Sequence, residues 1–299
     1  MSRRVVLLVN PTAGKGRGVR LLAPVTERLR RGGLHVDVLV GHDAGEASHL
    51  LRAAVALDPP ARPDGVVSLG GDGLVHLAVQ VLAGTGVPLG VVPAGTGNDV
   101  ARALGIDRRD PAAAADLVVA GHTRESDLGR AGERWFAGVL GSGFDSMVNE
   151  RANTMTWPRG RSRYNVAMVA ELRTFRPVPY LLHLDGEAWE TEAMLVAVGN
   201  GPSYGGGMRV CPDARLDDGL LDVTVLGPIS KPEFLRVFPS VYRGTHVRHR
   251  AVTVRRARTV SLRAEGVTAY ADGERVVSLP VQVVAVPAAL RVFTAGPAT

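Results

Sequence analysis

The stretch VVSLGGDG at residues 66–73 decides the fold, because a short apolar run ends directly in three glycines around one acid. Apolar runs followed by glycine-rich loops also occur at 5–16, VVLLVNPTAGKG, and at 89–99, LGVVPAGTGND, and a further apolar run lies at 36–40. Helical patterns follow these runs, at 19–31, 44–57, 75–82 and 99–104. Strand, loop and helix in alternation, with uninterrupted apolar strands, predict a parallel sheet covered by helices.

The length and the second half of the chain predict a second domain. A single core stops growing at about 250–300 residues, and this chain has 299. From residue 126 onward most segments are strand-like, and 153–175 is the main helical exception. Asp-Gly turn pairs separate the strands, at Asp185-Gly186, Asp218-Gly219 and Asp272-Gly273. We expect an α/β domain at 1–125 and a mainly antiparallel domain at 126–299; whether 290–293 return to the first domain stays open.

The composition excludes several classes of protein. One cysteine, Cys211, gives neither a disulfide framework nor a cysteine-based zinc site. No apolar stretch reaches the ~20 residues that span a bilayer, and the run at 5–9 is too short for a signal-peptide core, so we expect a cytoplasmic protein. The net charge of +6 favours acidic partners, and Lys15 and Lys231 are the only lysines. The arginines suit phosphate contacts, although a genome rich in G and C would give the same excess.

The three glycine-rich loops favour a nucleotide site. Ligands of open parallel sheets bind where strands end, and glycines let backbone N–H groups approach phosphate oxygens. One such loop would be a simple turn, but three at strand ends favour a nucleotide. A Walker A loop fails because Gly16 follows Gly14-Lys15, and a dinucleotide pattern starting at Gly14 breaks at Val19. Asp72 is an acid between glycines, which favours a metal or metal-bound water over a plain turn.

Taken together and in order, these motifs resemble the diacylglycerol kinase catalytic family. That family includes bacterial soluble diacylglycerol kinases, sphingosine kinases and ceramide kinases, and it is distantly similar to NAD kinases. The resemblance continues through nearly the whole chain. Its later motifs are Gly143-Phe144-Asp145, Gly199-Asn200, Gly205-Gly206-Gly207, the segment PDARLDDGLLD at 212–222, and Asp272-Gly273-Glu274.

The resemblance implies a nucleotide-binding α/β domain followed by a β-sandwich, with the site between them. It implies ATP- and Mg²⁺-dependent phosphorylation of a lipid hydroxyl, with Asp72 and Glu274 as catalytic residues, Asp72 in the metal and water network and Glu274 as the proton acceptor. For Mg²⁺ it implies Asp218 with the backbone carbonyls of Arg215 and Leu220. For ATP it implies the residues of the three loops: Asn10, Pro11, Thr12, Ala13, Gly14, Gly70, Gly71, Asp72, Gly73, Gly95, Thr96, Gly97 and Asn98.

The residue chemistry agrees with these roles but leaves alternatives. A carboxylate such as Glu274 can accept a hydroxyl proton, and Asp217-Asp218 offers oxygen ligands for a hard cation, although a solvated hairpin turn would look the same. The triplet Asp-Gly-Glu also occurs at 185–187, and we interpret Glu187 as a surface residue. Two positions depart from the family: Leu74 stands where Thr is usual, and 38–42 lacks the usual Thr on the adenosine side.

Lipid access is expected at a membrane surface. Aromatic and basic residues alternate at 155–163, which favours an interfacial segment, whereas 166–175 favours an amphipathic helix packed on the sandwich. The basic segment 248–258 has no recognised nucleic-acid module, so nucleic acid is not expected. We expect a kinase that is peripheral at the inner face of the membrane and converts diacylglycerol to phosphatidic acid. A sphingoid base or other lipid alcohol as substrate, a catalytically silent regulator and a homodimer stay open.

Overall fold

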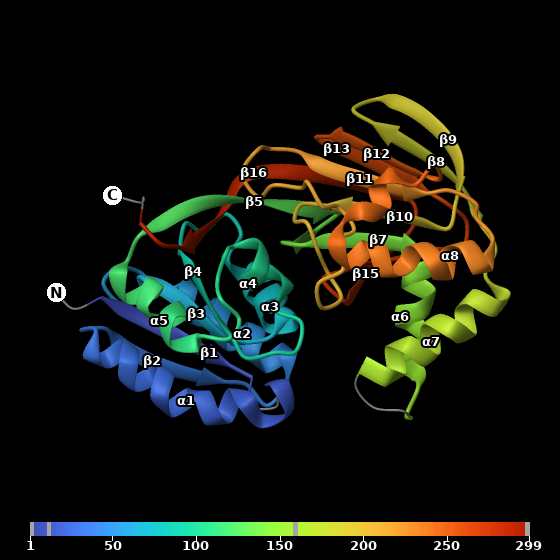
Figure 1. Ribbon diagram of the computed structural model, residues 1–299. Helices are drawn as coiled ribbons and strands as arrows, with labels where there is room; N and C mark the ends of the chain where they lie inside the picture. Colours follow the sequence, from blue (N-terminus) through green and yellow to red (C-terminus); the bar gives the residue numbers. More distant parts are fainter. Residues whose placement is uncertain (1–2, 11–12, 158–160, 297–299) are drawn as a thin grey trace. The chain divides into compact units, whose positions relative to one another are not determined.

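The computed structural model describes residues 3–10, 13–157 and 161–296 (Figure 1). The chain divides into two compact units. Unit 1 holds Met1–Leu128 and Val286–Thr299, and unit 2 holds Gly129–Ala285. The placement of the last strand was open in the sequence, and the structure puts its end in unit 1. No helix among the described residues is long and apolar enough to cross a membrane.

Unit 1 contains the predicted parallel sheet. Its strand order is β2-β1-β3-β4-β16, and every neighbouring pair is parallel. These strands are β1 (Arg4–Val9), β2 (His35–Val40), β3 (Gly65–Gly70), β4 (Leu89–Pro93) and β16 (Val281–Phe293). All residues of β3 and β4 are buried, which is why these strands are apolar without alternation. The predicted parallel sheet is confirmed.

Five helices cover this sheet, and α1 packs on α5 while α2 packs on α3. They are α1 (Ala13–Arg31), α2 (Ala44–Val55), α3 (Asp72–Leu82), α4 (Asp99–Ala103) and α5 (Pro111–Ala120). The prediction placed the start of the first helix at Val19, which is wrong because helix α1 already includes the glycine-rich residues from Ala13. Helix α5 was missed, although Asp110 caps it by accepting from the N–H of Ala113 at 2.9 Å.

Unit 2 is a β-sandwich of antiparallel strands. One sheet has the order β12-β11-β10-β7-β14-β15. Its strands are β7 (Val139–Gly143), β10 (Leu195–Gly199), β11 (Leu221–Leu226), β12 (Val252–Ala257), β14 (Thr268–Ala271) and β15 (Glu274–Ser278). The other sheet contains β8 (Val178–Leu184), β9 (Glu187–Ala193), β13 (Thr259–Arg263) and the first part of β16. The chain enters the unit through β5 (Thr123–Ala131) and β6 (Arg134–Phe136).

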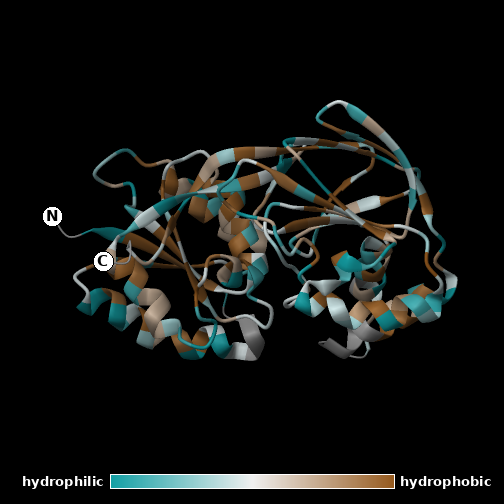
Figure 2. Ribbon diagram, turned by 45° about the horizontal axis from the view of Figure 1, so that its top comes forward, coloured by the Kyte–Doolittle hydropathy of each residue, from teal (hydrophilic) through white to brown (hydrophobic). Residues whose placement is uncertain are grey.

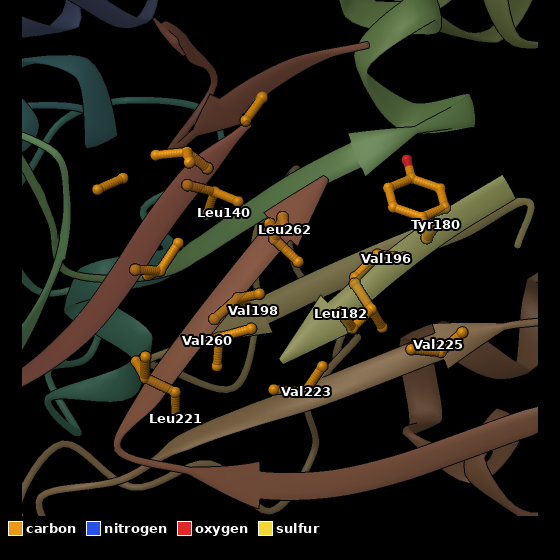
Figure 3. Packing of buried hydrophobic residues seen from close by; sticks show 14 of the residues in the cluster. Leu140, Tyr180, Leu182, Val196, Val198, Leu221, Val223, Val225, Val260 and Leu262 are labelled. Atoms are coloured by element: carbon orange, nitrogen blue, oxygen red, sulfur yellow. The ribbon is translucent and has the colours of Figure 1, made fainter. Parts of the chain in front are cut away.

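The sandwich core consists of side chains from both sheets in one buried layer (Figure 3). Leu140, Val196 and Val223 come from the first sheet, and Leu182 and Val260 from the second; none is more than 1% exposed. Buried residues alternate along β8, as a sheet with one covered face requires. Figure 2 colours the chain by hydropathy, and its helices carry both brown and teal segments.

Helices α6 (Phe144–Thr154), α7 (Arg161–Thr174) and α8 (Lys231–Val237) pack together in unit 2, followed by the short helices η1 (Phe238–Arg243) and η2 (Thr245–Arg248). The rings of Phe175 and Phe234 meet that of Phe144 edge-on, with centroids 5.2 and 5.1 Å away. The predicted helical region, 153–175, begins too late, because α6 already starts at Phe144. Arg151 forms an ion pair with the buried Glu171 and so joins α6 to α7.

Candidate functional site

Three adjacent strands of unit 1 end at the predicted nucleotide loops. Strands β1, β3 and β4 are neighbours and parallel, so their carboxyl ends lie at the same edge of the sheet. The N–H of Asn10, just after β1, donates to the carbonyl of Leu69 near the end of β3 at 3.4 Å. Pro11 and Thr12 lie outside the described residues, and Ala13 and Gly14 open helix α1.

The second and third loops approach each other through bare backbone. The N–H groups of Ala94 and Gly95 both donate to the carbonyl of Gly70, at 2.8 and 3.2 Å. A Cβ on Gly95 would lie 2.5 Å from the Cα of Gly71, closer than side-chain carbons come to other atoms. Glycine at these positions is therefore a packing requirement, because any Cβ atom would prevent the two loops from approaching so closely.

Asn98 acts inside its own loop. Its Oδ1 accepts from the N–H of Gly95 at 3.0 Å and its Nδ2 donates to the carbonyl of Gly95 at 3.0 Å. Its backbone has a φ of 55°, a left-handed conformation that asparagine tolerates, and the residue is 4% exposed. Thr96 is exposed in the same loop. The structure therefore gives Asn98 a role in shaping the loop, whereas Thr96 is open to a ligand.

Asp72 and Leu74 begin helix α3 at this edge. Oδ1 of Asp72 accepts from the N–H of Val100 at 3.2 Å, so the acid links the end of β3 to helix α4. Leu74, at the position of the family's Thr, is 7% exposed. A Cβ on Gly70 would lie 2.7 Å from Cδ2 of Leu74. Leu74 thus packs inward against the end of β3.

Two arginines beside the third loop had no assigned role in the sequence. Nη1 of Arg108 donates to the carbonyl of Gly97 at 3.2 Å. Nε of Arg102 lies 3.6 Å from Oδ1 of the buried Asp99. Arg102 lies in the helical pattern at 99–104, but no pattern in the sequence marked Arg108. The loops at 70–73 and 94–98 together form what we call the glycine edge of the sheet. Both arginines place positive charge beside this edge, where it would attract an anionic ligand.

The predicted metal residue Asp218 is held by an arginine in unit 2. Its Oδ1 accepts from the N–H of Leu220 at 3.1 Å, and its Oδ2 forms an ion pair with Arg256. The same guanidinium reaches Oδ1 of Asp222 at 2.9 Å. Asp222 is 2% exposed. Burial raises the pKa of Asp222, and its contacts with Arg256 oppose this rise. Arg256 therefore bridges two acids, a pairing that the sequence did not reveal.

The donor atoms around Asp218 fit Mg²⁺ in chemistry. The predicted set is one carboxylate with the carbonyls of Arg215 and Leu220, all hard oxygen ligands. Within the described part of the chain, no group of three or more His, Cys, Asp or Glu side chains could hold a metal. A cation here would therefore depend on backbone oxygens and would compete with Arg256 for Asp218.

Glu274 is the first residue of β15 and is exposed. Among the described residues its carboxylate has no hydrogen-bond or ion-pair partner, so this group is available. Glu187, in the second Asp-Gly-Glu triplet, is different. Its Oε1 lies 3.2 Å from Nη1 of Arg255, and that guanidinium lies 4.5 Å above the ring of Trp189. Of the two glutamates, Glu274 is the one with a free carboxylate.

An apolar pocket with a cavity volume of about 70 Å³ lies in unit 2 where helices cover a sheet. Its walls include Phe144, Val148, Met168, Leu226, Phe234, Phe238 and Val252. Its polar lining residues include Asp145 and His246. Asp145 is 6% exposed and accepts from Nδ2 of Asn149 at 3.1 Å. His246 lies with Nε2 3.1 Å from the carbonyl of Val210. Burial lowers the pKa of His246, which keeps the imidazole neutral at neutral pH.

Family models match both units of the chain. The family model "Diacylglycerol kinase catalytic domain" matches residues 4–131, and "YegS C-terminal NAD kinase beta sandwich-like domain" matches 138–294. A diacylglycerol kinase of Mycobacterium tuberculosis (strain ATCC 25618 / H37Rv) is 48% identical over 296 residues, covering 97% of this chain and 94% of the relative. A diacylglycerol kinase of Bacillus subtilis (strain 168) is 30% identical and covers 91% and 90%.

Solved structures show the same fold. The crystal structure of a diacylglycerol kinase from Bacillus anthracis str. Sterne has a TM-score of 0.74 at 22% identity, covering 99% of this chain and 97% of the other. An NAD kinase from Archaeoglobus fulgidus has a TM-score of 0.54 at 14% identity, covering 98% and 93%. The matching models, the related sequences and the fold together establish that this chain belongs to the diacylglycerol kinase family and is a diacylglycerol kinase-like enzyme.

Proposed function

We propose that the enzyme transfers the γ-phosphoryl group of ATP to the hydroxyl of diacylglycerol and forms phosphatidic acid. The observation that carries the lipid part is the apolar pocket of unit 2, whose walls suit an acyl chain. The 48% identical relative is named diacylglycerol kinase, which supports this lipid over other alcohols. Each buried methylene of an acyl chain contributes ~0.8 kcal/mol, so a pocket of this kind favours a lipid over a soluble alcohol.

ATP binds at the glycine edge of unit 1 in this proposal. The close approach of Gly71 and Gly95 leaves no Cβ atom between these two loops, and Arg102 and Arg108 add positive charge beside them. The NAD kinase neighbour was solved in complex with ATP, which supports ATP as the donor. Asp72 acts through a metal or an ordered water, because a carboxylate and a phosphate repel each other directly.

Glu274 accepts the proton of the lipid hydroxyl. As the hydroxyl oxygen forms its bond to the γ-phosphorus, the bond from that phosphorus to the bridging oxygen breaks and ADP leaves with the electron pair. The proton passes to the carboxylate of Glu274. Its freedom from other partners among the described residues supports this role. Mg²⁺, when bound, neutralises negative charge; Asp218 and the carbonyls of Arg215 and Leu220 are the residues that would hold it.

The enzyme meets its lipid at a membrane surface, and exposed apolar side chains of unit 2 support this part of the proposal. Trp157 is 79% exposed, Val169 on α7 53%, Leu235 on α8 51% and Tyr242 on η1 51%. Helix α7 also buries Ala167 and Leu172. The arginines of 159–163 lie outside the side chains that the structure describes. Exposed Arg173, Lys231 and Arg236 nearby in the same helices would attract anionic lipid.

A transfer assay with three candidate lipid substrates tests the proposal. Purified enzyme, labelled ATP and Mg²⁺ are mixed with micelles of diacylglycerol, sphingosine or ceramide, and labelled lipid is counted. We expect transfer to diacylglycerol that stops when the metal is chelated. Preferential transfer to sphingosine would establish the sphingoid-base alternative. Absence of transfer to all three lipids, with ATP still bound, would establish a silent regulator.

A further inference from the structure

Two hairpins of unit 2 carry the same triplet, Asp-Gly-Glu, and fold in the same way. The turn between β8 and β9 has φ values of 50° at Asp185 and 96° at Gly186. The turn between β14 and β15 has 54° at Asp272 and 90° at Gly273. Positive φ at both central residues is typical of a type I′ turn, in which Asp-Gly is a favoured pair. Local sequence therefore explains both turns equally well.

The carboxylate of Asp272 also fastens its turn to another segment. Oδ2 accepts from the N–H of Ala137 at 3.0 Å and Oδ1 accepts from the N–H of Gly138 at 2.9 Å. The N–H of Asp272 donates to the carbonyl of Val139 at 3.2 Å. A Cβ on Gly138 would lie 2.6 Å from Oδ1 of Asp272, so this contact requires glycine. These hydrogen bonds fix the turn that precedes β15.

The segment that receives Asp272 is itself held from another residue. Asn200 donates its backbone N–H to the carbonyl of Gly138 and its Nδ2 to the carbonyl of Ala137, both at 2.9 Å. Asn200 is fully buried, and Ala137 is 6% exposed. Buried backbone groups that are fully paired resist displacement, because breaking the pairs leaves polar atoms unsatisfied. Asp272 is therefore anchored to a rigid part of unit 2.

We propose that Asp272 is a positioning residue for Glu274, two residues further along the chain. This inference rests on the proposed function, in which Glu274 accepts the hydroxyl proton. Glu274 has no partner among the described residues that could orient it, so its place depends on the backbone at the start of β15. Asp272 fixes that backbone, and a displacement of about 1 Å at a reacting group can cost a hundredfold in rate.

Asp185 provides a matched control inside the same unit. Its carboxylate accepts from the N–H of Arg258 at 3.0 Å and from the N–H of Thr259 at 2.8 Å. Its own N–H donates to the carbonyl of Thr259 at 2.9 Å. Each aspartate thus accepts from two backbone N–H groups, but the glutamate two residues after Asp185 is ion-paired with Arg255. A purely structural role would make the two positions respond alike.

The test compares Asp272→Asn with Asp185→Asn in the full-length enzyme. Asparagine keeps the positive φ of the turn, but its amide NH₂ faces one of the two backbone donors and cannot accept from it. We expect Asp272→Asn to lower kcat about tenfold while KM for ATP stays within about twofold. Asp185→Asn should leave kcat unchanged. Thermal midpoints of both variants show how much of each effect is stability.

Each result decides the inference. Full kcat in Asp272→Asn, or an equal loss in Asp185→Asn, overturns the positioning role. If Asp272→Asn does not fold, Gly138→Ala displaces the same carboxylate, and an unchanged kcat there overturns it as well. Glu274→Gln separates this inference from the proposed function. An active Glu274→Gln removes Glu274 as the base, whereas an inactive Glu274→Gln beside a fully active Asp272→Asn removes only the role of Asp272.

Discussion

Oδ1 of Asp72 accepts a hydrogen bond from the backbone N–H of Val100 at 3.2 Å, so the acid that follows β3 also fixes the segment that follows β4. The glycines of the two loops meet at the same place, since the N–H of Gly95 donates to the carbonyl of Gly70 at 3.2 Å. Asp72 therefore combines two possible tasks, loop geometry and negative charge near the phosphates. A substitution that keeps the first and removes the second can separate them.

Asp72→Asn is that substitution, because an amide oxygen can still accept from the N–H of Val100. We expect turnover to fall at least about a hundredfold from the lost charge. The thermal midpoint should shift by no more than about 2–4 °C, which corresponds to ~1 kcal/mol. Labelled-ATP transfer and thermal unfolding measure the two effects. Asp110→Asn, at the cap of α5, is the matched control and should keep full turnover. Retained turnover in Asp72→Asn would restrict Asp72 to loop geometry.

Leu74→Thr restores the family's hydroxyl but removes buried apolar volume. Leu74 is 7% exposed and packs against Gly70, so we expect the free energy of unfolding to fall by about 2 kcal/mol. KM for ATP should stay equal or fall. Leu82→Thr, on the same helix and fully buried, should cost similar stability without changing KM. A clear rise in KM for Leu74→Thr alone would show that leucine is adapted to the nucleotide.

The sequence predicts the nucleotide half of the fold well because its signals are local. Apolar runs such as 66–69 end at glycines, and both features lie within a few residues of each other. The missed helix α5 had a local signal too, Asp110 before Pro111, which is a favoured helix start. The inward position of Leu74 was not readable, because it depends on packing against the end of β3.

Long-range pairs account for most of what the sequence could not show. Arg256 lies 34 residues from Asp222 along the chain, and only the pairing of β11 with β12 brings them together. The two Asp-Gly-Glu turns are identical locally and differ in what surrounds the glutamate. Glu187 meets Arg255, which is 68 residues away. Such contacts follow from strand register, which neither composition nor spacing specifies.

Arg256→Gln should destabilise the enzyme in a pH-dependent way. Burial raises the pKa of Asp222 and Arg256 opposes it, so the variant raises this pKa further. The folded state then binds a proton more readily than the unfolded state, and stability falls as the pH rises from the unfolded to the folded pKa. We expect a loss of about 1–2 kcal/mol at neutral pH that shrinks in acid. Denaturant unfolding at several pH values measures it.

The matched control is Arg255→Gln, because Arg255 pairs only with the exposed Glu187 among the described acids. It should cost less than about 0.5 kcal/mol at every pH.

Arg256→Gln also frees Oδ2 of Asp218, so a lower Mg²⁺ concentration should suffice for half-maximal activity. A pH-independent loss of stability in Arg256→Gln would mean that Asp222 stays charged without its partner.

Trp157→Ala tests the membrane contact. Trp157 is 79% exposed, so its removal should barely change the thermal midpoint. We expect binding to vesicles of mixed neutral and anionic lipid to weaken about tenfold, because an interfacial tryptophan contributes apolar area at headgroup level. Trp135→Ala is the control, because Trp135 is half-buried and covered by another side chain. The guanidinium carbon of Arg130 lies 5.3 Å from the centroid of the Trp135 ring. Equal vesicle binding by wild type and Trp157→Ala would move the contact elsewhere.

Val252→Phe tests whether the apolar pocket holds an acyl chain. Val252 lines the pocket and is half-buried on β12, where an aromatic residue suits a strand. A larger side chain shortens the space that an acyl chain can occupy. We therefore expect kcat/KM for long-chain diacylglycerol to fall about tenfold relative to kcat/KM for a short-chain diacylglycerol, which corresponds to the loss of one or two buried methylenes. KM for ATP should stay unchanged. Val254→Phe, two residues along the same strand and 38% exposed, does not line the pocket and should leave the preference unchanged. An equal loss for both chain lengths in Val252→Phe would place the acyl chain outside this pocket, because only a chain inside it can sense the missing space.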